Sequence, residues 1–426
     1  MARALYGLAV TLLVPVALAR LAWRARRQPG YLDRVPERLG FAPSAGAGPV
    51  IWIHAVSVGE TRAAAPLVAR LERDYPKARL LLTHMTPTGR ATGVELFGDR
   101  VERAWLPWDA PFAVRRFLDR ARPDFGILLE TEIWPNLLAE CARRNVPVHL
   151  VNARLSARSA RGYGRVAGLA REALGHLAGI AAQTPADAAR LEALGAREVA
   201  VTGNIKFDLD VPADTADKAA AIRERFGAGR RICLAGSTRE GEEALLVEAV
   251  EAAGLDEDIL VVVVPRHPQR FDEVATLLAA RGSPLARRSR GEAVPASARY
   301  ALGDSMGEML AYCAAADVVI VGGSFLPFGG QNLIEPCAVG RPVLFGPHTF
   351  NFEAAAEAAI DRGAGLRARD AAHAVAIAKD LLADGARRER MGADALAFAR
   401  ENRGALGRLE AWLAPRLAAS RGPARG

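Results

Sequence analysis

Short apolar runs alternate with helical stretches along most of the chain, and the alternation occurs in two separate series. Runs that are apolar throughout, with helices between them, are typical of strands buried on both faces of a parallel sheet. The pattern therefore predicts two doubly wound α/β domains, and 426 residues suffice for both. The expected strands are residues 50–54, 79–83, 125–129 and 146–151, then 231–236, 259–265, 318–321 and 342–345.

A polar, proline-containing segment, residues 207–214, lies between the two series and is typical of a linker. We therefore expect one domain over residues 28–210 and another over residues 211–426, after an N-terminal segment of residues 1–27. Ligands bind at the carboxyl ends of the strands in open α/β sheets. Two Rossmann-like domains facing a cleft form the layout of a GT-B glycosyltransferase.

The N-terminal segment combines an apolar run, residues 4–19, with arginines at 20, 24, 26 and 27. The first 40 residues hold seven Arg against Asp33 and Glu37, which gives +5 of the net charge of +8. This charge beside an apolar run favours a membrane surface over nucleic acid as the partner. We predict that residues 1–27 form a membrane anchor with the rest of the chain on the cytoplasmic side. A cleaved signal peptide and an amphipathic docking helix are the alternatives.

The four cysteines are scattered, with no CxxC pair and no Cys/His ligand spacing. They indicate reduced thiols in a cytoplasmic compartment and argue against a structural zinc site. Asp208-Leu-Asp210 spells the DxD metal motif of some glycosyltransferases, but it lies in the linker instead of at a strand end. We therefore predict no metal and no other cofactor.

A glycine-rich loop in the second series, VGGSFLPFGGQNLIE over residues 321–335, follows an expected strand and precedes a helical pattern from 332 to 339. A strand, a glycine-rich turn and a helix together present backbone amides to an anion, often a nucleotide phosphate. Glycine clusters also form ordinary turns, so the placement of this loop at a strand end is what favours a ligand site.

Glu60 is the strongest catalytic candidate of the first domain, because it follows the first expected strand in HAVSVGE, residues 54–60. A carboxylate at the positive end of a helix is held ionised, which is the state that a general base requires. The alternative is a capping box formed by Ser57 and Glu60, which explains the same spacing without chemistry.

Other polar residues also follow expected strands. Arginines and hydroxyls in residues 152–159 suit a phosphate or form a solvated basic loop. Asn332 and Glu335 either cap a helix or bind ribose hydroxyls. The remaining candidates at strand ends are Glu130, Glu132, Lys206, Arg266, His267 and the segment Met306-Gly307-Glu308.

Taken in order, these motifs resemble one family, the transferases of 3-deoxy-D-manno-octulosonic acid (Kdo). The motifs that carry the resemblance are HAVSVGE, ETEIWPNLL, NARLSARS, GNIKFD, VPRHPQRF, GDSMGEM and GGSFLPFGGQNLIEP. The resemblance runs from about residue 30 to 355 and, more loosely, to the end of the chain.

The resemblance implies an inverting glycosyltransferase of the GT-B fold in lipopolysaccharide core biosynthesis. It would transfer Kdo from CMP-Kdo to a lipid A precursor (lipid IVA) at the cytoplasmic face of the inner membrane. Residues 28–210 would bind the acceptor and residues 211–426 the CMP-Kdo donor. A membrane-associated GT-B enzyme that uses a different nucleotide sugar is the alternative. A non-catalytic lipid- or nucleotide-binding protein would need no ionised Glu60.

Site roles follow from the resemblance residue by residue. Glu60 matches the general base, and Glu130 and Lys206 match residues that support the transition state. The positions that match nucleotide-binding segments are Arg266, His267, Met306, Gly307, Glu308, Asn332, Leu333, Ile334 and Glu335.

Overall fold

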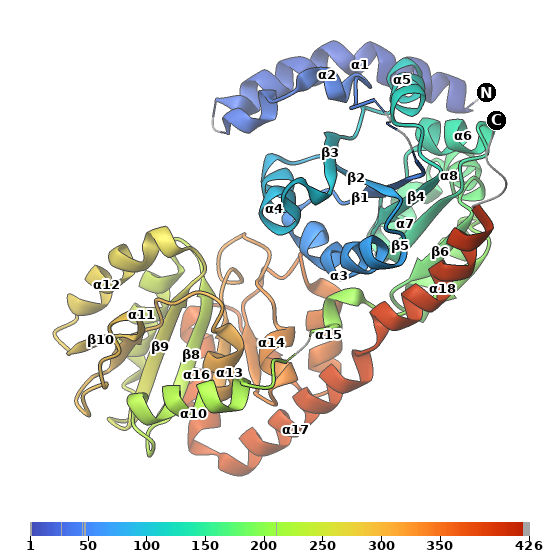
Figure 1. Cartoon of the computed structure of the whole chain (residues 1–426). Helices are drawn as coiled ribbons and strands as arrows, with labels where there is room; N and C mark the ends of the chain where they lie inside the picture. Colours follow the sequence, from blue (N-terminus) through green and yellow to red (C-terminus); the bar gives the residue numbers. More distant parts are fainter. Residues whose placement is uncertain (1, 27, 45, 47, 210, 421–426) are drawn as a thin grey trace. The chain divides into compact units, whose positions relative to one another are not determined.

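The computed structural model describes residues 2–26, 28–44, 46, 48–209 and 211–420, which form two compact units (Figure 1). The first unit contains the described residues up to Asp208 together with those from Gly404 onward, and the second contains Leu209–Arg403. Each unit is built on one parallel seven-stranded sheet, which confirms the predicted α/β class.

The sheet of the first unit has the strand order β3-β2-β1-β4-β5-β6-β7, which reverses between β1 and β4. The two neighbours at this point pair in parallel, with Ile51 opposite Phe125 and His54 opposite Leu128. The strands are β1 (Val50–His54), β2 (Arg79–His84), β3 (Glu102–Trp105), β4 (Phe125–Leu129), β5 (Val148–Ala153), β6 (Gly179–Ala182) and β7 (Val199–Val201).

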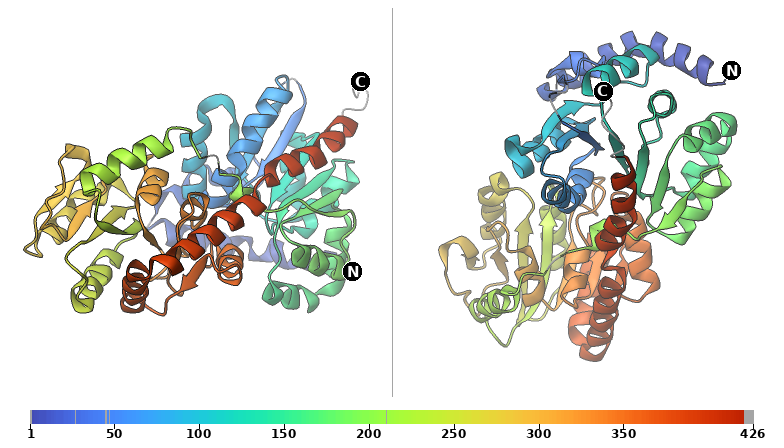
Figure 2. Two further views of the ribbon diagram at one scale, coloured as in Figure 1. Left: turned by 90° about the horizontal axis from the view of Figure 1, so that it is seen from below. Right: turned by 45° about the vertical axis from the view of Figure 1, so that its right-hand side comes forward.

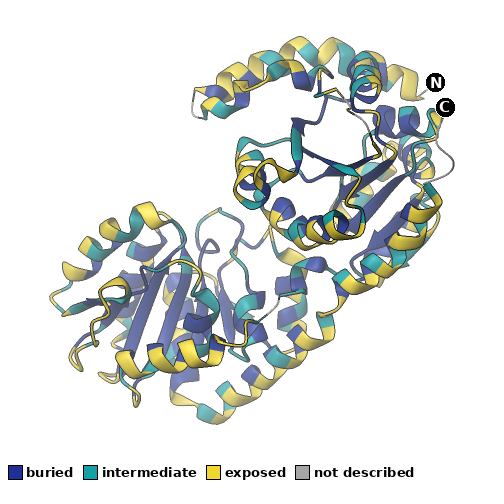
Figure 3. Ribbon diagram, in the orientation of Figure 1, coloured by how far each residue is buried: buried dark blue, intermediate teal, exposed yellow. Residues whose placement is uncertain are grey.

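Helices cover both faces of this sheet, so the strands are buried on both sides (Figure 3). Trp52 of β1 packs into one core with α5 and α6, whereas Ile53 packs into the other with α3. The helices of the unit are α1 (Ala2–Ala25), α2 (Val35–Arg38), α3 (Val58–Asp74), α4 (Pro87–Phe97), α5 (Pro111–Ala121), α6 (Pro135–Arg143), α7 (Ala157–Gly164), α8 (Ala167–Gly175), α9 (Pro185–Ala193) and α18 (Ala405–Ser420), with 3-10 turns η1 (Pro29–Leu32), η2 (Gly98–Arg100) and η3 (Ile205–Phe207).

The last helix, α18, belongs to the first unit, whereas the sequence pattern placed it in the second domain (Figure 2). Leu409, Leu413 and Leu417 are buried in the core that contains Ile53. The ring of Trp412 lies edge-on against that of His149 in β5, with the centroids 5.5 Å apart. An amphipathic helix shows in its sequence that one face is buried, but not which core that face meets.

The sheet of the second unit has the order β10-β11-β9-β8-β12-β13-β14 and reverses between β8 and β12. At this point Val321 lies opposite Gly236. The strands are β8 (Arg231–Thr238), β9 (Ile259–Pro265), β10 (Leu285–Arg287), β11 (Tyr300–Leu302), β12 (Val318–Val321), β13 (Val343–Phe345) and β14 (Gly365–Arg367).

The helices of the second unit include one, α14, of only five residues, which begins two residues later than the pattern predicted. Leu333 is the N-cap residue, and Oδ1 of Asn332 accepts a hydrogen bond from the amide of Ile334, the first helical residue, at 3.0 Å. The full set is α10 (Thr215–Phe226), α11 (Glu242–Ala253), α12 (Phe271–Ala279), α13 (Met309–Ala315), α14 (Ile334–Ala338), α15 (Glu353–Asp361), α16 (Ala371–Ala383) and α17 (Gly385–Asn402), with 3-10 turns η4 (Pro268–Arg270) and η5 (Arg288–Arg290).

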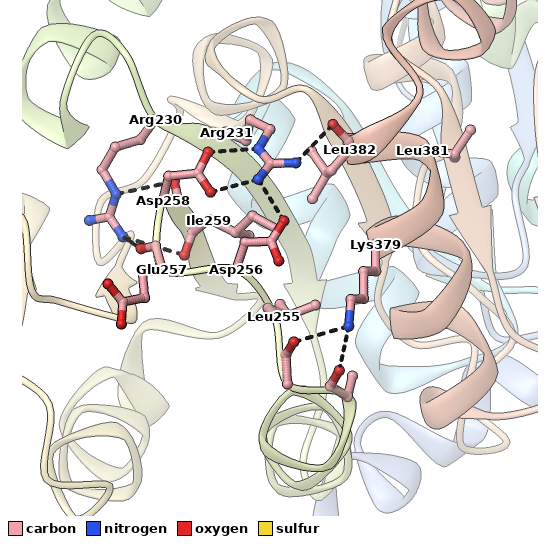
Figure 4. Close-up of polar contacts among 12 residues, drawn as sticks. Arg230, Arg231, Leu255, Asp256, Glu257, Asp258, Ile259, Lys379, Leu381 and Leu382 are labelled. Carbon is pink, nitrogen blue, oxygen red and sulfur yellow. Dashed lines mark hydrogen bonds and ion pairs between the residues drawn. The ribbon is translucent and has the colours of Figure 1, made fainter.

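Polar contacts tie α16 and the start of β8 to the loop before β9 (Figure 4). Arg231 donates to Asp258 and Asp256 and to the carbonyl oxygen of Leu382 in α16. Lys379, also in α16, donates to the carbonyl oxygens of Ala253 and Gly254 at 2.9 and 3.0 Å. These contacts lie at the amino ends of β8 and β9 and stabilise the fold away from the carboxyl ends.

Candidate active site

Three predicted catalytic residues come together at the carboxyl end of the first sheet. Glu60 and Glu130 follow β1 and β4, the two strands between which the strand order reverses. Lys206 lies in η3, and its Nζ is 2.6 Å from Oε1 of Glu130. The charge of Glu130 raises the pKa of Glu60, so these two carboxylates interact.

The ion pair depends on how η3 is held against the sheet. Asn152, near the end of β5, accepts a hydrogen bond from the amide of Ile205 at 3.1 Å. Asn204 accepts one from the amide of Lys206 at 3.0 Å. Because β5 is the neighbour of β4, these two asparagines bring Lys206 from the edge strand β7 to Glu130.

Glu130 occupies the left-handed region of backbone space, with φ of 63°. Its amide donates to the carbonyl oxygen of Val151 at 3.0 Å, which continues the pairing with β5 for one residue beyond β4. For a residue with a Cβ this conformation costs roughly 1–2 kcal/mol. Such strain persists only where the surroundings impose it and is concentrated at functional sites.

Glu60 lies in the first turn of α3 and is nearly buried, with 9% of its surface exposed. Its Oε2 accepts a hydrogen bond from the amide of Val56 at 2.8 Å, and its Oε1 accepts one from the hydroxyl of Ser57 at 2.9 Å. The amide of Glu60 donates in turn to Ser57 Oγ at 3.4 Å. The capping contacts of the alternative interpretation are therefore present, and they fix the orientation of the carboxylate.

The protonation of Glu60 differs from the expectation that the helix end keeps it ionised. Burial raises the pKa of Glu60 to about 7, and the negative charge of Glu130 acts in the same direction. The hydrogen bonds from Val56 and Ser57 oppose this shift but do not cancel it. A carboxyl group with a pKa near neutral pH is well matched to accepting and releasing a proton.

In the second unit, the glycine-rich loop between β12 and α14 is organised by Glu242, which the sequence analysis did not single out. The buried carboxylate of Glu242 accepts hydrogen bonds from the amides of Gly323 at 2.5 Å, Phe325 at 2.9 Å and Arg239 at 2.9 Å. Two amides that the loop was expected to offer to a ligand are thus bound by the protein itself. The signal that could have identified Glu242 in the sequence is a pair of consecutive acids, Glu242 and Glu243, at the start of a helix that follows a strand.

The glycines of this loop meet two separate steric demands. A Cβ on Gly322 would lie 2.5 Å from the carbonyl oxygen of Ser237 in the neighbouring strand β8. Gly323, Gly329 and Gly330 have φ of 69°, 92° and 79°. The loop therefore packs directly against β8 and then turns back toward α14, which residues with a Cβ would hinder.

Arg266 and Glu335 interact although they follow different strands. Burial raises the pKa of Glu335 to about 7, while the positive charge of Arg266 and a hydrogen bond from Asn332 oppose the shift. The backbone amide of Arg266 donates to the carbonyl oxygen of Thr238 at 2.9 Å, which joins the end of β9 to the end of β8. The structure thus brings Arg266, Asn332 and Glu335 together at one end of the second sheet.

His267 lies among cationic side chains. Its pKa is lowered by burial and further by the positive charges of Arg239, Arg266 and Arg270. Arg270 is paired with Glu243 at 2.7 Å, and Arg239 lies over the ring of Phe328, 4.5 Å from its centroid. The carboxyl ends of β8 and β9 therefore carry a concentration of positive charge that suits an anion.

The segment Met306-Gly307-Glu308 follows the neighbouring strand β11 and precedes α13. Met306 is exposed, and Gly307 has φ of 77° with open space around its Cα. Glu308 accepts hydrogen bonds from Arg288 at 2.9 Å and from the Ser305 hydroxyl at 2.5 Å.

Leu333 and Ile334, two further expected nucleotide-binding residues, have buried side chains. A ligand at this site would therefore meet their backbone and not their side chains.

Asp208 serves the fold. Its carboxylate accepts hydrogen bonds from the amides of Gly404 and Leu406, which begin α18. Asp210, the second acid of the DxD spelling, lies outside the described residues. Among the residues that are described, no three His, Cys, Asp or Glu side chains form a group that would hold a metal ion.

Comparison with known sequences gives consistent matches. Residues 33–209 match the profile of a family described as 3-deoxy-D-manno-octulosonic-acid transferase (kdotransferase). A protein of Bordetella pertussis named 3-deoxy-D-manno-octulosonic acid transferase is 47% identical over 97% of this chain and its own full length. The protein of the same name from Haemophilus influenzae is 37% identical over 95% of this chain and 96% of its own length.

Two solved structures show a similar fold. A glycosyltransferase from Rickettsia africae is 14% identical, with a TM-score of 0.53 over 88% of this chain and 98% of its own. A UDP-GlcNAc 2-epimerase from Neisseria meningitidis is 13% identical, with a TM-score of 0.55 over 86% of this chain and its whole length. The likeness covers both units, so these proteins share the two-domain α/β fold.

Proposed function

The chain belongs to the Kdo transferase family of glycosyltransferases, and from this premise we propose that it transfers Kdo from CMP-Kdo to a lipid A precursor with inversion. The observation that carries the proposal is the cluster of Glu60, Glu130 and Lys206 at the point where the first sheet reverses its strand order. The unit that contains this cluster would bind the acceptor.

Glu60 would act as the general base. In a single displacement the acceptor hydroxyl loses its proton to the Glu60 carboxylate, and its oxygen attacks the anomeric carbon of Kdo as CMP leaves. The contacts with Val56 and Ser57 hold the carboxylate in one orientation for this transfer. Lys206, held by Glu130 at 2.6 Å, would stabilise negative charge that develops in the transition state.

The second unit would hold the donor. CMP leaves as a nucleoside monophosphate, so fixed positive groups at one phosphate are enough for its departure. Arg266 would bind that phosphate, and the charge gathered around His267 supports this placement. Glu335, beside Arg266, would accept hydrogen bonds from ribose hydroxyls, and Met306 to Glu308 and Asn332 to Ile334 would line the remainder of the nucleotide.

Incubation of the purified full chain with CMP-Kdo and lipid IVA tests the proposal directly. Mass spectrometry should show a product heavier by one or more Kdo residues and release of CMP. Parallel reactions with UDP-sugars cover the alternative donors. Turnover of a UDP-sugar in place of CMP-Kdo would contradict the proposed donor, and absence of product with every donor would contradict transfer.

Donor binding is tested by Arg266→Ala. A charge-assisted hydrogen bond is worth about 1.5–3 kcal/mol, so affinity for CMP-Kdo should fall roughly 10- to 150-fold. Arg290→Ala, at an exposed position in η5, is the matched control and should bind normally. Chelator should leave turnover unchanged, and strict dependence on an added divalent metal would rule out the metal-free site.

Helix α1 is long and apolar enough to cross a membrane by its length and composition. Near its start, Arg3 pairs with Glu172 at 2.7 Å and Tyr6 bonds to Asp109, and near its end Leu21 and Ala25 pack with Tyr31 against Trp108. A helix that touches the same unit near both ends lies along its surface.

The opposite side of α1 exposes Leu5, Leu8, Leu12, Leu13, Val16 and Trp23. We propose that this side attaches the first unit to the cytoplasmic face of the inner membrane, with the helix lying in the membrane plane.

A further inference from the structure

Three arginines of α7 have no role in the proposed transfer. Arg158, Arg161 and Arg165 follow one another at helical spacing along α7 and its C-cap, and all three are exposed. The opposite side of the helix, with Ala160 and Tyr163, packs against the core of the first unit. The outer side of α7 therefore carries a row of three guanidinium groups, which we call the arginine row.

The charges of the arginine row have no partners in the fold. None of the three guanidinium groups forms a hydrogen bond or an ion pair with a residue that the structure describes. Two acids on the helices next to α7 are engaged elsewhere. Asp187 of α9 accepts a hydrogen bond from the amide of Leu155 at 2.9 Å and pairs with Arg190 at 3.1 Å. Glu172 of α8 pairs with Arg3 at 2.7 Å.

The stability of α7 does not explain the whole row. Arg161 and Arg165 lie near the end of the helix, where a cation interacts favourably with the helix dipole. Arg158 lies in the first turn, where a cation is unfavourable, and that turn contains no acid to offset it. Arg158 and Arg161 also repel each other at a spacing of three residues. A ligand with negative charge would remove both costs.

Gly162 lies one turn after Arg158, between the other two arginines of the row. Its backbone is not in the left-handed region, and an added Cβ would meet no atom of the described residues within 4 Å. A glycine inside a helix lowers helix stability relative to alanine. Neither backbone conformation nor packing therefore accounts for this glycine, but it does leave room for a ligand to approach the helix backbone.

The arginine row begins beside the proposed catalytic cluster. The amide of Arg154, four residues before Arg158, donates a hydrogen bond to the carbonyl oxygen of Glu130 at 3.4 Å. On the inner side of α7, the charge of Glu132 helps burial to raise the pKa of Tyr163. The row extends about 10 Å along the helix from Arg158 to Arg165. A molecule with a hydroxyl near Glu130 can thus place an anionic substituent on α7.

We propose that Arg158, Arg161 and Arg165 bind a phosphate monoester on the acceptor and so select phosphorylated acceptors. A guanidinium group binds two phosphate oxygens at once, and a phosphate monoester carries about 1.5 to 2 negative charges near pH 7. The contact of the Arg154 amide with Glu130 favours a phosphate of the acceptor over the headgroup of a surrounding lipid. This inference rests on the proposed function, because it takes the first unit to bind the acceptor.

The first experiment measures binding without a donor. The probes are lipid IVA in detergent and the same lipid after a phosphatase has removed its phosphate monoesters. The unsubstituted protein should bind lipid IVA more tightly, and a double variant, Arg158→Gln with Arg161→Gln, should bind both lipids with the same low affinity. The control is Arg197→Gln, an exposed arginine at the amino end of β7, which should retain the preference. A preference that persists in the double variant would overturn the proposal.

The second experiment separates KM from kcat. In the double variant the KM for lipid IVA should rise roughly tenfold or more while kcat changes little, since charge-assisted hydrogen bonds to the acceptor are lost. Gly162→Ala should raise the unfolding midpoint and also raise this KM, because a methyl group then lies where the phosphate approaches. A fall in kcat alone in the double variant, or an unchanged KM in Gly162→Ala, would contradict phosphate binding on this side of α7.

A third experiment distinguishes the acceptor from the membrane as the source of the phosphate. Vesicles of phosphatidylglycerol and of phosphatidylcholine should sediment the double variant and the unsubstituted full chain equally. Loss of binding to the phosphatidylglycerol vesicles alone, with normal affinity for detergent-dispersed lipid IVA, would assign the arginine row to lipid headgroups and overturn the proposal.

Failure of this inference and failure of the proposed function give different results. If the protein forms no Kdo product but prefers lipid IVA through the arginine row, the transfer reaction fails and the phosphate site stands. If product forms and the double variant has the KM of the unsubstituted protein, the transfer reaction stands and the phosphate site fails.

Discussion

Lys206 and Glu130 approach to 2.6 Å between Nζ and Oε1, with their side chains only 17% and 11% exposed. Glu130 follows β4 and Lys206 lies in η3, which follows β7, so the pair joins segments whose strands are separated in the sheet by β5 and β6. A buried pair of this kind is costly to break, because the remaining partner keeps an uncompensated charge.

Replacing Lys206 by Met should therefore lower both stability and activity. The charge of Glu130 remains without its partner, and loss of one partner of a buried pair costs about 3–5 kcal/mol, less here because both groups are partly exposed. Adding Glu130→Gln should recover stability in a denaturant titration but not the rate. Recovery of the rate in the double variant would show that the pair is structural and that Lys206 does not support the transition state.

Glu60→Gln should abolish most turnover while the protein stays folded. The amide retains an acceptor for Val56 and a donor for Ser57, whereas a base is lost that contributes roughly 10²–10⁴-fold. Single-turnover rates and donor binding are the measurements. The control is Ser57→Ala, which removes a cap worth about 1 kcal/mol and should lower the unfolding midpoint more than the rate. Near-normal activity of Glu60→Gln would reduce these contacts to a capping box.

The rate should rise with pH up to about 7 and then level off. Burial, together with the charge of Glu130, raises the pKa of Glu60 to about 7, and the base acts only when ionised. Below that pH the rate should fall about tenfold per unit, measured as kcat/KM at constant ionic strength. A profile that is flat between pH 5.5 and 9 would contradict the assignment.

The raised pKa of Glu60 also makes the stability of the protein depend on pH, and stability decreases with rising pH where the rate increases. The folded state holds a proton on Glu60 that the unfolded chain releases, so stability is greatest below the unfolded pKa and decreases as the pH rises through about 7. Glu60→Gln removes this dependence and should unfold at higher denaturant concentration than the unsubstituted protein at pH 8. An equal or lower midpoint for Glu60→Gln at that pH would show that the ionised carboxylate is not destabilising.

Glu242→Ala should disorder the glycine-rich loop between β12 and α14 and weaken CMP binding. Three amides, those of Arg239, Gly323 and Phe325, lose their acceptor, and each unsatisfied buried group costs about 1–3 kcal/mol. Calorimetry with CMP and thermal unfolding are the measurements. Glu240→Ala, an exposed neighbour, should change neither. Unaltered CMP affinity in a destabilised Glu242→Ala protein would separate the loop from the nucleotide site.

The orientation of α1 can be measured with one introduced thiol. The four native cysteines are buried and should react slowly with a maleimide. In intact spheroplasts, Ala4→Cys should resist a membrane-impermeant maleimide and react only after lysis, as should Glu240→Cys, the cytoplasmic control. Labelling of Ala4→Cys before lysis would show that α1 crosses the membrane and that its contacts with Glu172 and Asp109 are absent there.

The alternation of strands and helices was predictable because burial on both faces leaves continuous apolar runs. The strand boundaries were less predictable. The strand expected at 146–151 is Val148–Ala153, because its pairing with β4 starts at Val148 and its pairing with β6 includes Ala153, beyond the polar Asn152. Glu60 and Glu130 could be identified from the sequence, because both are acids that follow expected strands. The ion pair between Glu130 and Lys206 could not be predicted, because it depends on asparagines that fold η3 back from the edge of the sheet.

The glycine-rich loop shows a different limit of sequence reasoning. Its glycines led us to expect backbone amides presented to a ligand, and in the structure residues 323, 329 and 330 adopt left-handed conformations. They did not indicate that an internal carboxylate, Glu242, already binds two of the amides. A pattern of glycines indicates the path of the backbone. Which group accepts hydrogen bonds from the backbone amides depends on side chains of another helix.

The first unit needs the far end of the chain to finish its core, since Leu409, Leu413 and Leu417 of α18 fill space beside Ile53. During synthesis at roughly 5–20 residues per second, the ribosome must complete the entire second unit before those leucines emerge. For on the order of ten seconds or more the nascent first unit therefore carries an uncovered apolar strip. Chaperones that bind such surfaces have that interval in which to engage it, and a stop codon before residue 404 would leave the strip permanently open.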